Sequence, residues 1–168
     1  NIILLDNKSV ILEGVKVIGS TLWSDIPRIH YSFIENYVND YKRIRKFINP
    51  LRAQDTVNLH KKAVSFIRSE IKTDHTVLVL THHAPYMKGT SAPQYEGTIG
   101  TLAFSTDLSD LFGNNVHTWA FGHTHWCYDK VIKGTRLISN PRGYPSDSIK
   151  YKNNKVIIVP NHVRKKNI

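Results

Sequence analysis

The chain has 168 residues, of which 40% are hydrophobic and 21% charged, and its formal net charge is +10. This length and balance are typical of one globular domain and argue against a disordered chain. No apolar run reaches the roughly 18 residues of a transmembrane helix, and no signal peptide is visible, so no membrane partner is expected.

The first half of the chain predicts a hairpin followed by helices. Residues 12–19 predict strand, turn and strand, with Glu13-Gly14 as the turn and an alternating pattern over 15–18. A less regular helix is expected over 31–47, and the clearest helix over 56–71, capped by Asp55 or Thr56. One face of this helix should pack on a sheet. Its apolar positions are Val57, His60, Val64, Ile67 and Ile71, widened by Leu59, Ala63 and Phe66.

The second half predicts strands separated by loops. Residues 77–80 form an unbroken apolar run, typical of an inner strand covered on both faces. A long loop is expected over 89–100, a short helix over 106–112 with Gly113 as its C-cap, and a strand over 116–121. Lys133-Gly134 predicts a hairpin joining 128–132 to 135–139, and a last strand is expected over 155–159.

Histidines follow two of these predicted strands directly. His82 and His83 come after 77–80, and His123 and His125 come after 116–121. Ligands bind at the carboxyl ends of strands in open α/β sheets, and neutral imidazoles are good ligands for transition metals. Because the chain has nine histidines, the spacing alone leaves a metal site and a chance arrangement both open.

Two motifs resemble those of the calcineurin-like metallophosphoesterases. Thr81-His82-His83-Ala84-Pro85 resembles the family's histidine motif after a buried strand, and Phe121-Gly122-His123-Thr124-His125 matches its Gly-His-x-His motif. Further segments resemble one bacterial-type branch of that family. They are Thr21-Leu22-Trp23, Asn39-Asp40-Tyr41, Asp55-Thr56, His60 and Asn140-Pro141-Arg142-Gly143-Tyr144.

The resemblance implies an α/β fold, part of a layered sandwich of two mixed β-sheets flanked by helices. Residues 1–145 would be the C-terminal part of a phosphoesterase domain, and 146–168 a terminal strand and basic tail. His82 and His123 would bind one divalent transition metal and His125 a second, either of them manganese, iron, zinc or nickel. His83 would support the site, contact a substrate phosphate or be structural.

Three motifs that the family needs are absent: Asp-x-His, Gly-Asp with a bridging aspartate, and Gly-Asn-His-Asp/Glu. In the family's order they precede residue 1, so the N-terminal part of the fold is expected to be missing. Asn39-Asp40 lies in the wrong place to replace them, and Asn161-His162 comes after the Gly-His-x-His motif. The resemblance therefore implies a phosphoesterase acting through a dinuclear site, of which this chain supplies about half.

Two alternatives remain open. A truncated, non-catalytic metal-binding domain is favoured by the absent motifs. A basic nucleic-acid-binding module fits the net charge of +10, but the basic residues are scattered and not interleaved with aromatics. The lone Cys127 excludes an internal disulfide and favours a reducing compartment, so a cytoplasmic location is expected. The expected partners are a phosphorylated substrate and, as an open question, further copies of the chain.

Overall fold

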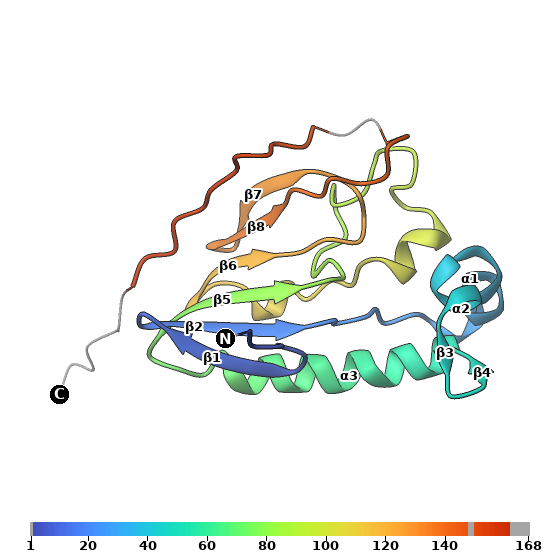
Figure 1. The fold of residues 1–168 in the computed structure, drawn as a ribbon, viewed down its shortest axis with the longest axis horizontal. Coiled ribbons are helices and arrows are strands. Elements are labelled where there is room, and N and C mark those ends of the chain that lie inside the picture. The colour runs from blue at the N-terminus through green and yellow to red at the C-terminus, as the bar shows by residue number, and fades with distance from the viewer. Residues whose placement is uncertain (1, 148–149, 162–168) are drawn as a thin grey trace.

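A computed structural model describes residues 2–147 and 150–161, and these form a mixed α/β fold (Figure 1). The main sheet has six strands in the order β1-β2-β5-β6-β8-β7, and the strands β3 and β4 form a separate two-stranded hairpin. The strands are β1 Lys8–Leu12, β2 Val15–Ser20, β3 Arg45–Lys46, β4 Asn49–Pro50, β5 Thr76–Thr81, β6 Val116–Ala120, β7 Tyr128–Ile132 and β8 Thr135–Ser139. The α-helices are α1 Tyr31–Tyr37, α2 Asn39–Arg43 and α3 Ala53–Glu70, and the 3-10 helices are η1 Arg28–His30, η2 Ile99–Ala103 and η3 Ser109–Leu111.

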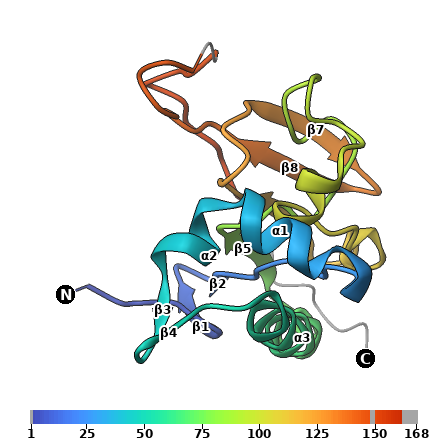
Figure 2. The same cartoon turned by 90° about the vertical axis from the view of Figure 1, so that its right-hand side faces the viewer.

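The four inner strands β2, β5, β6 and β8 run parallel, and the edge strands β1 and β7 are antiparallel to their neighbours. The carboxyl ends of the parallel strands therefore lie at one edge of the sheet. The short helices α1 and α2 lie beyond this edge, as the end-on view in Figure 2 shows. The predicted hairpins around Glu13-Gly14 and Lys133-Gly134 are confirmed.

The helix α3 packs on one face of the sheet, as its apolar stripe predicts. Val57, His60 and Ile67 are buried, whereas Leu59, expected to widen the stripe, is exposed. Ile67 belongs to the main core with Ile18 of β2 and Trp119 of β6. The helix begins three residues earlier than predicted, at Ala53. Asp55 lies in its first turn, where its carboxylate accepts a hydrogen bond from the Arg52 N–H at 3.2 Å.

The strand β5 is buried along one face, but its other face is exposed at Leu80. The prediction of an inner strand covered on both faces is therefore wrong at that residue. Val77 and Val79 point into the core under α3 and are fully buried, but Leu80 is exposed. Its cross-strand neighbours are Gly19 on β2 and Ala120 on β6, and these small residues leave its side chain uncovered.

Three other predictions need correction. The helix expected over 31–47 is two short helices, because the buried Val38 between them has extended backbone and belongs to a second core. The helix expected over 106–112 is only the 3-10 turn η3. The strand expected over 155–159 is absent: Val156 and Ile158 are exposed, and side-chain contacts such as Lys155 to Asp129 hold the segment instead of a strand ladder.

The sandwich implied by the resemblance is found only in part. One large mixed sheet and flanking helices are present, but a second large sheet is not found among residues 2–147 and 150–161. The predicted basic tail, 164–168, lies outside the described residues. Among the described helices, none has the length and apolar character needed to cross a membrane.

Candidate metal centre

The candidate site is built where β5 and β6 end. These neighbouring parallel strands each deliver a histidine pair to the same edge of the sheet, His82 and His83 after β5 and His123 and His125 after β6. The Gly122 N–H donates to the His82 carbonyl at 3.0 Å, which joins the two loops directly. Residues separated by forty positions thus become neighbours because parallel pairing aligns the two strand ends.

Three of the four histidines form one cluster. The rings of His82 and His123 have their centroids 4.6 Å apart, and those of His83 and His123 4.3 Å apart. His123 Nδ1 and His82 Nε2 lie 2.8 Å apart, within hydrogen-bond distance. The cluster is closed by aromatic side chains, with Trp23 beside His83 and Phe104 edge-on to His123.

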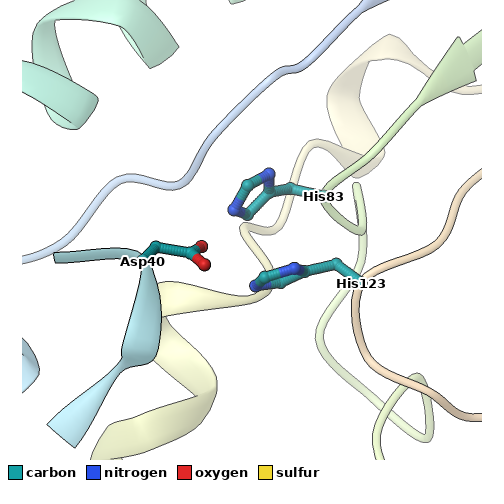
Figure 3. A group of neighbouring side chains, drawn as sticks. All are labelled: Asp40, His83 and His123. Atoms are coloured by element: carbon teal, nitrogen blue, oxygen red, sulfur yellow. The ribbon is translucent and has the colours of Figure 1, made fainter. Parts of the chain in front are cut away.

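A carboxylate enters this cluster from α2. Asp40, His83 and His123 each offer one ligand atom, and these atoms all lie within 4.8 Å of one another (Figure 3). Asp40 and His123 are half-buried, and His83 is almost fully buried. Carboxylate oxygen and imidazole nitrogen are ligands that zinc, iron, manganese and nickel accept. The three residues therefore make a mixed N and O donor set from three separate parts of the chain.

The hydrogen bonds of the histidines leave ligand nitrogens free. His83 Nδ1 donates to the Thr21 carbonyl at 3.1 Å, since a carbonyl can only accept, and this fixes the tautomer whose Nε2 has a lone pair. His123 Nε2 is buried and has no hydrogen-bond partner within the described part of the chain. A buried polar nitrogen without a partner costs free energy, and a bound metal ion would satisfy it.

The electrostatics keep the imidazoles neutral. Burial, followed by the nearby His82 and His125, lowers the pKa of His123 to about 3. Burial is also the main cause that holds the pKa of His83 well below its ordinary value, and of a smaller lowering of the pKa of His82. Burial raises the pKa of Asp40, and the neighbouring His82 offsets part of that rise. Neutral imidazole is the form that binds metals, so no histidine proton has to be lost before a cation binds at this site.

His125 lies close to this cluster but is held by a different set of residues. Its Nδ1 lies 2.8 Å from the Asp147 carboxylate, and its ring meets that of Tyr144 edge-on at 4.6 Å. The Tyr144 N–H donates to the same carboxylate at 2.7 Å, so residues 144–147 fold back over His125. His123 and His125 both have left-handed backbone, at φ of 61° and 49°, an uncommon conformation for residues with side chains.

The structure thus groups the predicted residues differently from the sequence. The resemblance implies that His82 and His123 bind one metal, and that His83 supports the site, contacts a substrate phosphate or is structural. The tightest group instead combines His83 and His123 with Asp40, and places His82 against His123. By its place in the chain Asp40 does not replace a family motif, and no motif includes Asp147, which contacts His125. Neither has a local signal, since both depend on how distant loops dock.

Comparisons with known proteins add one relative. The chain is 31% identical over 155 residues to a protein of Acanthamoeba polyphaga mimivirus named uncharacterized protein L509. The match covers 86% of this chain but 55% of the viral protein, so the chain spans about half the length of that relative. No protein-family model matches the chain, and no solved structure does.

Proposed function

We propose that the chain binds a divalent transition metal through Asp40, His83 and His123, and that this site belongs to a metal-dependent phosphoesterase. The observation that carries the proposal is the convergence of three ligand atoms within 4.8 Å from α2 and from the ends of β5 and β6. The resemblance of the two histidine motifs to the calcineurin-like metallophosphoesterases gives the reaction class. The net charge of +10 suits an anionic, phosphorylated substrate.

Each residue has a separate role in this proposal. Asp40 supplies the negative charge that three neutral imidazoles lack. His83, held by the Thr21 carbonyl, presents Nε2 in a fixed direction. His123 presents its partnerless Nε2, and His82 supports the ring of His123 from the other side at 2.8 Å. A divalent ion at such a site polarises a phosphoryl oxygen and lowers the pKa of a water molecule.

The surroundings of the site determine how a substrate would approach. Trp23 contacts His83 and Phe104 contacts His123, so apolar rings lie on two sides of the histidine cluster and lower the local polarity, which strengthens electrostatic interactions there. His125 and Tyr144 stand beside it, with His125 oriented by Asp147. In the dinuclear arrangement implied by the resemblance, His125 would serve the second metal, and its orienting carboxylate suits a ligand role.

The alternative is a metal-binding domain without turnover. One observation favours it. Residues 2–147 and 150–161 contain a single group of three or more potential ligand residues, so they offer one such metal site and not two. That group is Asp40, His83 and His123. One ion polarises a phosphate less effectively than two that clamp both the attacking and the leaving oxygen. We therefore expect the chain alone to bind metal well and to hydrolyse phosphate esters slowly.

The test uses chelator-stripped protein titrated with zinc, manganese or nickel by calorimetry, followed by phosphate release from a simple phosphomonoester. We expect binding of one ion that His123→Ala abolishes, with turnover far below the typical enzyme value of about 10 per second. A matched control is His117→Ala, which removes a histidine of β6 that lies outside the cluster. Unchanged metal affinity in His123→Ala would refute the site, whereas metal binding without any hydrolysis would favour the alternative.

A further inference from the structure

The hairpin β3–β4 displays two large apolar side chains to solvent. Phe47 and Ile48 form its tip, and they are 93% and 91% exposed. The hairpin follows α2 directly and projects from the end of the molecule where α1 and α2 lie (Figures 1 and 2). Single exposed apolar residues are common on proteins, but two adjacent ones at the end of a projecting hairpin are a specific arrangement.

The turn at the tip of the hairpin places Phe47 in a backbone conformation that is unfavourable for a large side chain. Lys46 pairs with Asn49, which leaves Phe47 and Ile48 as a two-residue turn. Phe47 has a φ of +58°, where hairpins of this kind prefer glycine. The conformation costs free energy for a bulky residue, and the exposed ring recovers none of it through packing within the chain. A contact outside the chain would recover it.

Four basic residues directly precede the apolar tip in the chain. Lys42, Arg43, Arg45 and Lys46 all lie in the five residues before Phe47, and all are exposed. Lys46 is paired with Asp55 at 2.6 Å. In the part of the chain that the structure describes, the other three take part in no ion pair within 4.0 Å. Their charge is therefore available to an anionic partner.

We propose that this hairpin docks on an anionic lipid membrane, with Phe47 and Ile48 entering the headgroup region and the three unpaired basic residues contacting lipid phosphates. Apolar side chains flanked by Lys and Arg are the pattern of segments that lie in membrane interfaces, and each basic residue adds attraction to an anionic surface. Such a contact lies at the membrane surface and needs no membrane-spanning helix.

The choice of a membrane over a nucleic acid rests on the tip itself. Proteins that hold single strands stack bases on aromatic rings, and an isoleucine offers no such platform. The exposed Ile48 side chain would gain no stacking contact from a nucleic acid, whereas a lipid interface accepts both side chains. The inference does not depend on the proposed metal site, because none of its residues is a proposed ligand.

The test is co-sedimentation of the full chain with vesicles of phosphatidylcholine alone and with about one third phosphatidylserine. We expect binding to the anionic vesicles, weakened by salt, and little binding to the neutral ones. The variant Phe47→Ser/Ile48→Ser should weaken binding by about tenfold or more, since burying even one such side chain is worth over 1.4 kcal/mol. The variant Arg43→Gln/Arg45→Gln should also weaken it.

Two matched controls keep the result specific. Val156→Ser/Ile158→Ser changes two other apolar residues, each 81% exposed, and Lys61→Gln/Lys62→Gln changes two exposed basic residues on α3. Both should bind anionic vesicles as the unchanged chain does. No binding to anionic vesicles at low salt, or equal losses in the hairpin variants and these controls, overturns the proposal. Tight binding to a single-stranded oligonucleotide without vesicle binding overturns it in favour of nucleic acid.

Discussion

The strongest test of the metal centre is the replacement of Asp40 by asparagine. Asp40→Asn keeps the size of the side chain but removes the one carboxylate in the ligand group with His83 and His123. Burial already raises the pKa of Asp40, so its charge costs free energy in the metal-free protein. The variant should therefore fold with unchanged or slightly higher stability when no metal is present.

The magnitude follows from linkage between binding and folding. A metal at 100 times its dissociation constant stabilises the folded chain by about 2.7 kcal/mol. For a chain of this size, each kcal/mol raises the melting temperature by about 2–4 °C, so the metal should raise it by about 5–10 °C. If losing the carboxylate weakens binding about 100-fold, the stabilisation at the same concentration falls to about 0.4 kcal/mol, or roughly 1 °C.

The assay is thermal unfolding of chelator-stripped protein with and without added zinc or manganese. Asp25→Asn is the matched control, because Asp25 is an exposed carboxylate that follows β2 and lies outside the ligand group. The control should keep the full metal-dependent rise in melting temperature. A rise in Asp40→Asn equal to that of the unchanged chain would refute the role of Asp40, and the same loss in both variants would show that the effect is not site-specific.

Two further predictions concern stability. Ile67→Ala should cost about 2–4 kcal/mol in urea unfolding, because Ile67 is fully buried between α3 and the sheet. Leu59→Ala, at an exposed position of the same helix, should change stability by less than about 0.5 kcal/mol, and similar losses in the two would contradict this packing. Burial lowers the pKa of His60, so the unfolded chain takes up a proton at higher pH than the folded one. The stability linked to His60 is thus complete above its ordinary pKa of 6.5 and is lost as the pH falls below that value, by at most about 1.4 kcal/mol per pH unit. Metal-free His60→Gln should show a flatter decline between pH 7.5 and 5 than the unchanged chain, and parallel declines would count against the buried neutral state.

Some features of this protein were decided by local sequence. The period of the apolar residues placed α3 and its buried face, and the turn residues placed the hairpins at Glu13-Gly14 and Lys133-Gly134. The histidine pairs could be placed at strand ends because they follow apolar runs directly. Each of these signals lies within a few residues of the feature that it predicts, so no tertiary contact is needed to find it.

Other features were decided only when the chain packed. The break at Val38 arises because that side chain enters a second core, and it is this break that separates α1 from the helix bearing Asp40. His83 belongs to the tightest group, and its ring is oriented by the Thr21 carbonyl, far away in sequence. Likewise, residues 156–159 form an apolar run typical of a strand but gain no ladder partner. The sequence alone determines which side chains lie at the ends of strands. The packing of distant segments determines which of these side chains contact one another, because hydrogen bonds and burial between distant segments have no local sequence signal.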